Sequence, residues 1–442
     1  MSQLRAARKS LETVRRSKEL LRSFYARDAR RREGGPLAWC MAGVSSEILH
    51  AFDVPWEFPE NFGTLCAAKQ VAGQFCEQAE AEGFSQDLCS YLRNSIGYVS
   101  RLVELGHVPP EAPRDGMAAP TMLLGSGSIC DPRIKWFQAI ASRYLPVPVF
   151  HTDPMSLPHD VDPHDPRIEA HYKELLRDTL SEQIAFLERH TGRPLDVERL
   201  RDAMANAQEA LALLWEIQEL RRAVPCPMGA EDYFMGGVIP LLYLLGERDA
   251  VEYLRQLRDE VRDRVARGIG VVPDERFRLL WMGIPPWYNL GFFNAVGALG
   301  AVFVIETVYF SGAPVEIDLA DPVAALVERS WKRAVWIHEW GAEVVPENCS
   351  LSGFSAPGMR LLRRWVQDYR LDGVVMHRTR SCRAVSWGQV HVKNQLAEEG
   401  IPSLIIESDM ADPRSWADAV IMGQVRGFLG GIESARGTAP AC

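Results

Sequence analysis

The chain has 442 residues, of which 47% are hydrophobic and 24% are charged. These proportions are typical of a globular protein and exclude wholesale disorder, and a chain of this length buries enough apolar surface to fold without disulfides. The formal net charge of −9 excludes a nucleic-acid-binding surface over the whole chain. The nine cysteines are therefore not needed as disulfide cross-links, and another role for them has to be considered.

The first 34 residues are basic, with eleven Lys or Arg against four Asp or Glu, and they lack the apolar core of a signal peptide. They predict either a basic arm for a partner or an anionic cofactor, or an amphipathic helix whose apolar side carries Leu4, Leu11, Leu20 and Leu21. The longest apolar stretch, residues 290–305, is shorter than a bilayer span. We therefore expect a cytoplasmic protein without membrane contact, in which thiols stay reduced.

The first half of the chain predicts a parallel sheet. Strands are expected over residues 37–41, 121–124 and 147–150, and a short helix over 47–52. The small-residue loop 125–130 follows the second strand. Asp131-Pro132 then predicts the start of a helix, because proline is favoured in the first turn, where its missing N–H would have had no partner within the helix. Strand, loop, helix and strand within about 30 residues are typical of a βαβ unit.

The rest of the chain predicts helices and then a second sheet. Apolar side chains recur at helical spacing through residues 165–264. Strands follow over 277–282, 301–305, 373–377 and 401–406, with helices over 386–399 and 415–432. We therefore predict an α/β fold with two doubly wound parallel-sheet domains, an intervening helical segment and an N-terminal helix. The expected divisions are a helical arm (1–35), a first α/β domain (36–160), a helical segment (161–270) and a second α/β domain (271–442).

Three of the cysteines occupy places where chemistry is expected. Cys130 lies in the loop after a strand and just before a helix, Cys382 has the same place in the second half, and Cys89 begins a helical segment. The carboxyl ends of parallel strands face the ligand crevice, and a helix N-terminus favours a thiolate. Each cysteine alone also fits an ordinary core residue.

The remaining cysteines carry weaker signals. The sequence has no CxxC pair, which excludes a zinc ribbon and a ferredoxin-type cluster motif. Cys40, Cys66, Cys76 and Cys226 are interpreted as core residues, Cys349 as an undecided loop residue and Cys442 as irrelevant, with Cys40 and Cys349 the first to reconsider.

Several motifs, taken in order, resemble those of one known family. The motifs are Ser381-Cys-Arg-Ala-Val-Ser-Trp-Gly-Gln389, Gly400-Ile-Pro-Ser-Leu-Ile-Ile-Glu-Ser-Asp409, Asp412-Pro-Arg414 and Gln424-Val-Arg426. They resemble the 2-hydroxyacyl-CoA dehydratase / benzoyl-CoA reductase family, as do the segments around Cys89 and Cys130. Asp87-Leu-Cys-Ser-Tyr91 and Ile134-Lys-Trp-Phe137 are most similar to the larger cluster-bearing subunit of ATP-dependent (class I) benzoyl-CoA reductases.

The resemblance implies a cofactor and partners. Cys89, Cys130 and Cys382 would bind an iron–sulfur cluster, either 4Fe-4S or a larger cluster derived from it. A homologous, shorter cluster-bearing subunit and a separate ATP-hydrolysing activator that donates electrons would be the partners. The sequence has no GxxxxGK[ST] motif, and the loop at Gly125 lacks the third glycine of a dinucleotide fingerprint, so ATP and NAD are not expected in this chain.

Other candidate residues each have two interpretations. Glu47 matches the family's Pro-x-Glu-Leu-like segment, with serine in place of proline, and is either an acid near the substrate or a helix-start carboxylate. His151 follows a strand and is either a proton donor or structural. Trp136 and Trp387 either line a pocket for a planar acyl group or belong to the core. Arg383, with Arg378 and Arg380, is either functional, binding CoA phosphates or offsetting the negative charge of the cluster, or an ordinary surface residue.

The favoured function is reduction of an aromatic acyl-CoA substrate, benzoyl-CoA or a substituted analogue, to a cyclohexadiene carboxyl-CoA. One alternative is a 2-hydroxyacyl-CoA dehydratase subunit, which uses a recycled electron to eliminate water. Another is an electron-transfer subunit that does not bind substrate, and a third is an α/β protein with incidental cysteines.

Overall fold

The computed structural model describes residues 6–26, 34–127, 130–152, 157–158, 160–310, 312–341 and 359–438. Within these residues the strands form two sheets of four strands each, and every strand pair is parallel. The predicted α/β fold class is therefore confirmed, while the four-part division of the chain stays a prediction. Leu4, Cys349 and Cys442 lie outside the described residues.

The first sheet has the strand order β2-β1-β3-β4. Its strands are β1 (Ala38–Cys40), β2 (Trp56–Glu57), β3 (Met122–Ser126) and β4 (Val149–Thr152). The predicted strands correspond to β1, β3 and β4, whereas β2 is too short to leave a pattern in the sequence. Helix α6 (Pro132–Arg143) connects β3 to the parallel β4, which confirms the predicted βαβ unit.

The second sheet has the order β6-β5-β7-β8. Its strands are β5 (Phe277–Met282), β6 (Ala301–Glu306), β7 (Gly373–Thr379) and β8 (Ser403–Ser408). Every residue of β5 and β6 is buried, so helices must cover both faces of this sheet. The four predicted strands are found, the last of them beginning two residues later than expected.

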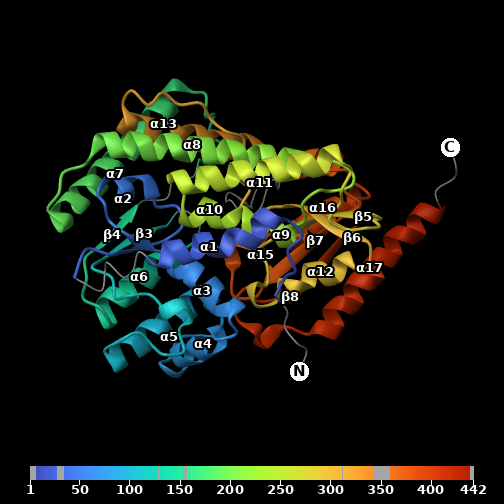
Figure 1. The fold of residues 1–442 in the computed structure, drawn as a ribbon, viewed down its shortest axis with the longest axis horizontal. Helices are drawn as coiled ribbons and strands as arrows, with labels where there is room; N and C mark the ends of the chain where they lie inside the picture. Colours follow the sequence, from blue (N-terminus) through green and yellow to red (C-terminus); the bar gives the residue numbers. More distant parts are fainter. Residues whose placement is uncertain are drawn as a thin grey trace.

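Helices surround both sheets (Figure 1). Those before and around the first sheet, besides α6, are α1 (Glu12–Ala26), α2 (Ser46–Ala51), α3 (Pro59–Ala68), α4 (Ala72–Ala81) and α5 (Ser90–Leu105). Between the sheets the chain forms α7 (Pro166–Thr191), α8 (Val197–Leu220), α9 (Ala230–Gly236), α10 (Val238–Tyr243) and α11 (Arg248–Ala266). The second half adds α12 (Gly291–Gly297), α13 (Pro322–Gly341), α14 (Met359–Asp368), α15 (Arg383–Ser386), α16 (Gln389–Glu398) and α17 (Asp418–Thr438).

The predicted helical stretch over residues 165–264 corresponds to α7–α11. Helix α8 has 24 residues and is therefore about 36 Å long. It packs against α11, and in Figure 1 the two helices extend above both sheets. The helical layer thus links the two α/β units over their length.

Helix α1 bears on the amphipathic interpretation of the basic N-terminus, while a basic arm for a partner or an anionic cofactor stays a prediction. It packs against α9, α10 and α11, and Leu11, Val14 and Phe24 are each at most 2% exposed. The described part of this segment is therefore an amphipathic helix that completes the core, as its leucine pattern indicated.

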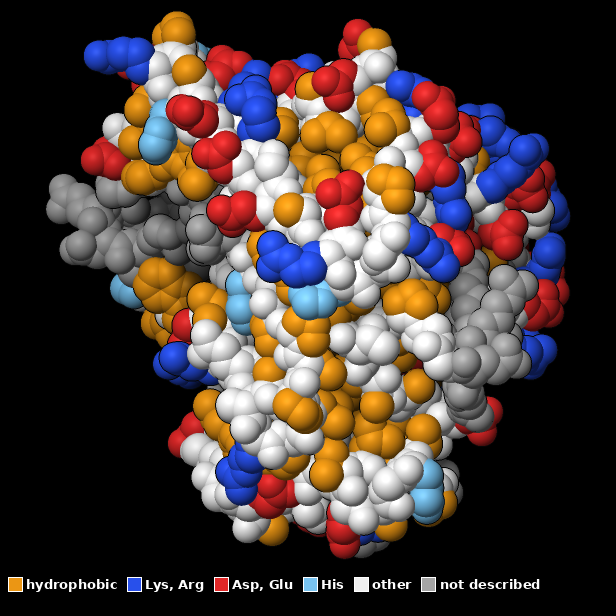
Figure 2. All heavy atoms as spheres, turned by 90° about the vertical axis from the view of Figure 1, so that its left-hand side faces the viewer, with side chains coloured by type: hydrophobic (Ala, Val, Ile, Leu, Met, Phe, Trp, Pro, Cys, Tyr) orange, Lys and Arg blue, Asp and Glu red, His pale blue; other side chains and the backbone are white. Residues whose placement is uncertain are grey.

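The surface separates into areas of different character. Figure 2 shows charged side chains spread over the upper part of one face, with hydrophobic side chains gathered in the lower half. None of the helices in the described ranges is both long and apolar enough to cross a membrane.

A close contact between two helices supports the segment that carries Cys89. Helices α4 and α5 pack so tightly that a Cβ at Gly97 would lie 1.8 Å from the carbonyl oxygen of Phe75. Only glycine allows this approach, since any side chain would overlap the backbone of α4. The close packing fixes α5, and with it the cysteine that immediately precedes α5.

Candidate cysteine site

Cys89, Cys130 and Cys382 come together from three distant segments. Cys89 immediately precedes α5, Cys130 lies between the carboxyl end of β3 and α6, and Cys382 lies between the carboxyl end of β7 and α15. Thiolate charges at Cys382 and Cys130 would each raise the pKa of Cys89, and a thiolate charge at Cys130 would raise the pKa of Cys382. The loops at the carboxyl edges of the two sheets therefore face a shared space.

Each of the three sulfur atoms meets the first turn of a helix. The first N–H groups of a helix have no partner within it, and they favour negative charge in front of them. The backbone N–H groups that face the sulfurs are those of Tyr91 and Leu92 for Cys89, of Arg133 for Cys130, and of Ala384 and Val385 for Cys382.

Burial nevertheless raises the pKa of all three thiols. Desolvation is the largest cause, and it raises the pKa of Cys382 to about 12 and that of Cys89 well above its usual range. Burial also raises the pKa of Cys130, although the positive charge of Arg133 opposes it. The helix N-terminus, which favours a thiolate, is thus the smaller of the two effects, and burial is the larger. Such thiols lose their protons when a bound metal takes the place of the proton.

A buried ion pair lies beside Cys130 and Cys89. Arg133, in the first turn of α6, is 4% exposed, and its charge acts on both thiols. Its Nε and Nη2 donate to Glu60 Oε1 at 3.0 and 2.6 Å, and its Nη1 donates to the carbonyl oxygen of Ala42 at 2.7 Å. Sequence reasoning missed this pair, because 73 residues separate its members. A basic residue three positions after a candidate ligand was the one available signal.

Two tyrosines and a tryptophan form another wall of the site. Trp287 Nε1 donates to the hydroxyl of Tyr91 at 2.6 Å, and the Tyr309 hydroxyl interacts with Tyr91 and with the charge of Cys382. Tyr309 has a φ of 70°, in the left-handed region that bulky residues rarely adopt. Backbone strain of this kind collects at functional sites. Tyr91 belongs to the motif around Cys89, whereas no motif marked Trp287 or Tyr309, because the strain at Tyr309 exists only in the folded backbone.

The loops of Cys130 and Cys382 are also joined at the surface. Arg383, predicted to bind substrate, forms an ion pair with Asp131, and both side chains are largely exposed. This pair connects the residue after Cys382 with the residue after Cys130. Arg378 and Arg380 are paired instead with Glu407 on β8, at 4.0 and 2.7 Å.

Glu47 is a buried carboxylate with a fixed cationic partner. It lies in the first turn of α2, is 1% exposed, accepts from Arg329 Nη1 at 2.5 Å and accepts from Ser45 Oγ at 2.6 Å. Burial alone would raise its pKa, but the charge and hydrogen bonds of Arg329 outweigh burial and lower it. The helix-start position was expected, whereas the partner on α13 was not. Its proposed role as an acid near the substrate stays a prediction.

His151 lies on β4 opposite Gly125, and its ring covers that glycine. A Cβ at Gly125 would lie 2.1 Å from His151 Nδ1. Among the described residues neither ring nitrogen has a hydrogen-bond partner, and burial lowers the pKa of the imidazole. Burial therefore favours the neutral imidazole, in which one ring nitrogen can donate a hydrogen bond and the other can accept one. Whether it serves catalysis stays a prediction.

The two tryptophans predicted to line a pocket have different surroundings. Trp136 is 2% exposed and packs in the core, edge-on to Phe137 with ring centroids 6.1 Å apart. Trp387 is 49% exposed and follows α15. Contact with an acyl group stays a prediction for both.

The other described cysteines, which are Cys40, Cys66, Cys76 and Cys226, are fully buried. They lie inside strands, helices or the packed core, whereas Cys89, Cys130 and Cys382 are partly exposed. Exposure to a binding partner thus separates the three candidates from the rest.

The arrangement suits some metal centres better than others. The residues that the structure describes include no group of three or more His, Cys, Asp or Glu side chains arranged to hold a metal ion. The three thiols nevertheless interact with one another across a common space. A cluster of several irons binds each cysteine at a different iron, so its ligands stand farther apart than those of a single ion. The donor set therefore fits a polynuclear cluster.

Comparisons with known proteins place the chain among enzyme subunits that act on CoA esters. The family model described as 2-hydroxyglutaryl-CoA dehydratase, D-component, matches residues 41–429. A benzoyl-CoA reductase subunit of Thauera aromatica is 25% identical over 441 residues, covering 95% of this chain and 94% of the relative. The (R)-2-hydroxyisocaproyl-CoA dehydratase alpha subunit of Clostridioides difficile is 26% identical over 417 residues, covering 93% and 94%.

A third relative, the alpha subunit of lactoyl-CoA dehydratase of Anaerotignum propionicum, is 24% identical and covers 96% of this chain and 98% of the relative. Dehydratase and reductase subunits thus match with nearly the same identity and along nearly the whole chain. The chain belongs to the family of 2-hydroxyglutaryl-CoA dehydratase D-components, a family of enzyme subunits that includes the benzoyl-CoA reductase subunit.

Proposed function

We propose that Cys89, Cys130 and Cys382 bind an iron–sulfur cluster, either 4Fe-4S or a larger cluster derived from it. The observation that carries this proposal is the convergence of one partly exposed cysteine residue from each of three segments, each at the start of a helix. Three thiolates leave one iron of a cubane without a protein thiolate. When bound, the cluster supplies single electrons at low potential.

The reaction favoured for this subunit is reduction of an aromatic acyl-CoA ring. It is supported by the similarity to the benzoyl-CoA reductase subunit of Thauera aromatica over 95% of the chain and by the motifs around Cys89 and Cys130. The second candidate is elimination of water from a 2-hydroxyacyl-CoA, which is supported by the several dehydratase alpha subunits among the relatives.

The chain's own residues have distinct parts in either reaction. Arg133 offsets negative charge next to Cys89 and Cys130. His151, neutral and without a partner among the described residues, provides or takes a proton. Glu47, held ionised by Arg329, orients a group of the substrate by accepting a hydrogen bond. Exposed Trp387 and Arg383 are the proposed contacts for the acyl group and CoA, and the buried Trp136 shapes the wall behind them.

The active enzyme is proposed to contain more than this chain. The relatives are named as subunits, which supports a partner subunit, and the partner proposed here is a homologous, shorter, cluster-bearing one. An ATP-hydrolysing activator would deliver the electrons, since the sequence has no phosphate-binding loop of its own.

The cluster is tested by chemical analysis of the anaerobically purified complex. Iron and acid-labile sulfide should be present, and Cys382→Ala should lose most of both. The matched control is Cys226→Ala, since Cys226 is fully buried and its thiol donates to the carbonyl oxygen of Met228 at 3.2 Å, and it should retain them. A colourless complex without iron would refute the proposal.

The reaction is tested by electron stoichiometry at steady state. Ring reduction consumes two electrons from the reductant for every product formed, whereas elimination of water recycles its electron and consumes none. Product formation that continues after the reductant is exhausted would decide against ring reduction and for the dehydratase.

A further inference from the structure

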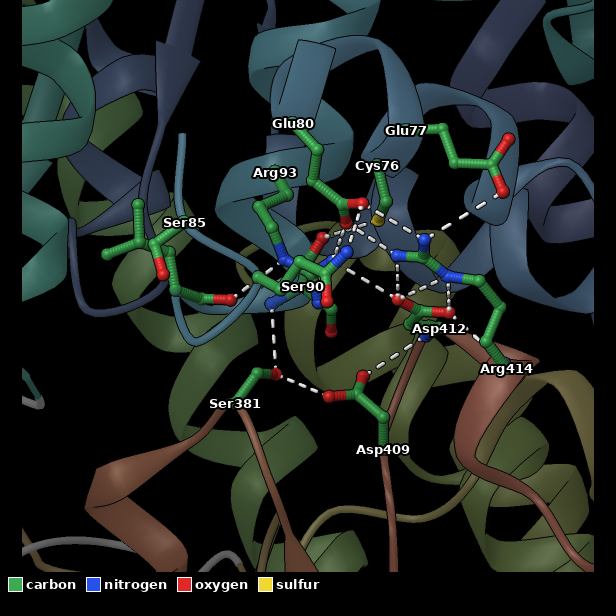
Figure 3. Close-up of polar contacts among 12 residues, drawn as sticks. Cys76, Glu77, Glu80, Ser85, Ser90, Arg93, Ser381, Asp409, Asp412 and Arg414 are labelled. Carbon is green, nitrogen blue, oxygen red and sulfur yellow. Dashed lines mark hydrogen bonds and ion pairs between the residues drawn. The ribbon is translucent and has the colours of Figure 1, made fainter. Parts of the chain in front are cut away.

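One hydroxyl connects the segments that carry Cys89 and Cys382. Ser381 Oγ accepts a hydrogen bond from the backbone N–H of Ser90 at 3.1 Å and donates to Asp409 Oδ2 at 2.5 Å. Ser90 directly follows Cys89, and Ser381 directly precedes Cys382. The bond therefore joins the first α/β unit to the second at the two residues next to the cysteines (Figure 3).

Asp409 is itself held rigidly. Its Oδ1 accepts from the backbone N–H groups of Ala411 and Asp412 at 3.0 and 3.1 Å, so the carboxylate caps the turn after β8. Asp409 is 4% exposed and Ser381 is 6% exposed, so water does not compete with these bonds. Ser381 is thus held by a buried carboxylate that is fixed to the turn after β8, and not by a mobile surface group.

A second set of contacts holds the same two units together. Arg93 Nη1, on α5, donates to Glu80 Oε1 at 2.5 Å and to Asp412 Oδ2 at 3.1 Å. Arg414 binds Glu80 at 2.5 Å and Asp412 at 2.6 Å, closing a ring of two cations and two carboxylates (Figure 3).

The cysteine loop on the first unit is fixed on both sides by this set. Arg93 Nε donates to the carbonyl oxygen of Leu88 at 2.9 Å, and Cys76 Sγ donates to the carbonyl oxygen of Ser90 at 3.6 Å. Backbone groups on either side of Cys89 are therefore held, and Ser381 supplies the contact that reaches the other unit.

We infer that Ser381 and Asp409 are positioning residues that set the separation of Cys89 and Cys382 and so the fit of the two units around the cluster. The inference rests on the proposed cluster-binding function. Without the Ser381 hydroxyl, the Ser90 N–H and one oxygen of Asp409 lose their partners in a buried place, which favours separation of the two loops. The separation of the two sulfurs then varies, and the cluster is held less firmly.

The separation of the thiols is measured first, independently of any cluster. Cys130, Cys349 and Cys442 are replaced by serine in the full chain, and a short bismaleimide is used to cross-link Cys89 to Cys382, with the product quantified by peptide mass spectrometry. Ser381→Ala should lower the cross-linking yield at a fixed time by about threefold or more. Asp409→Asn, which keeps the shape of the side chain, should act in the same direction.

The second measurement uses the anaerobically purified complex with all cysteines present. Release of iron to a chelator should be about tenfold faster in Ser381→Ala, which is the change expected for one lost hydrogen bond to a charged group. Ser381→Thr, which retains the hydroxyl, should return both readouts toward the wild type.

The matched control is Ser386→Ala. The Ser386 hydroxyl donates to the carbonyl oxygen of Thr379 at 2.9 Å, within the same segment, and so does not reach the first unit. Cross-linking and iron release in Ser381→Ala that match those of Ser386→Ala would overturn the inference. A wild type without iron whose cross-linking still depends on Ser381 would overturn the cluster proposal and support the positioning role.

Discussion

The buried ion pair of Arg133 and Glu60 gives a quantitative prediction about the site. The side chains are 5% and 13% exposed, and Glu60 Oε2 also accepts the backbone N–H of Ala42 at 2.8 Å. Arg133→Met leaves the Glu60 carboxylate buried without its cation. Removing one partner of a buried pair costs about 3–5 kcal/mol, because the remaining charge is desolvated without compensation.

The assay is denaturant unfolding of the iron-free chain, with the change in midpoint converted through the slope of the transition. Arg143→Met is the matched control on the same helix, since Arg143 is 53% exposed and lies 3.6 Å from Glu82. A surface pair of this kind is worth about 0–1 kcal/mol. A loss of less than about 1 kcal/mol in Arg133→Met would refute the reasoning from burial.

A double variant separates stability from metal binding. Replacing both partners, Arg133→Met with Glu60→Gln, removes the unpaired charge and should recover at least half of the lost stability. The charge of Arg133, which lowers the pKa of Cys130, is missing in the double variant, and loss of the Glu60 charge, a smaller effect in the opposite sense, offsets only part of this, so the thiol ionises less readily. Iron retention near pH 7 should therefore stay low in the double variant and improve as the pH is raised. Recovery of both properties together would show that Arg133 acts only through stability.

Three further predictions concern the frame of the site. Gly97→Ala places a Cβ 1.8 Å from the carbonyl oxygen of Phe75, so thermal unfolding should show a loss of about 1–3 kcal/mol or more. Arg329 lowers the pKa of Glu47 below its usual 4.5, so the pair's contribution is present above pH 4.5 and is lost as the pH falls further. Glu47→Gln should remove that part of the acid dependence of unfolding, and an unchanged pH profile would contradict it. Burial lowers the pKa of His151 below 6.5, so His151→Asn should lessen the destabilisation that develops as the pH falls below 6.5.

The sheets were predictable because parallel strands buried on both faces leave continuous apolar runs. β6 produces such a run over residues 301–305, and in β5, over residues 277–282, only Arg278 interrupts it. Helix starts were visible where proline and a capping residue occur together, as at Asp131-Pro132 before α6. The helix predicted over 386–399 corresponds to α16, whereas the strand β2 and the short helix α15 before α16 depend on tertiary contacts and left no such pattern.

The partners of the site residues were not predictable in the same way. Glu47 was identified at a helix start, but its ion pair with Arg329 joins residues 282 positions apart. The contact of Ser381 with Ser90 spans 291 positions. Periodicity reports which face of an element is buried, whereas contacts of this range follow from how the two sheets are placed against each other. Two signals pointed to Ser381, its adjacency to a candidate cysteine and its place in the motif that begins at Ser381, and neither indicated its contact with Ser90.

Proximity alone does not identify the candidate ligands, as a second pair of thiols shows. Cys66 and Cys76 also interact with each other, yet both lie inside helices and are fully buried. Burial raises the pKa of each, that of Cys76 to about 12, and no N–H group at a helix start faces either sulfur in the described contacts. Cys382 has an equally raised pKa but adds partial exposure and the first turn of α15. A thiol that binds a metal needs a route by which the metal reaches it, and N–H donors that stabilise the thiolate once its proton has left. For Cys130 and Cys382, a position in a loop between a strand and a helix predicts both properties.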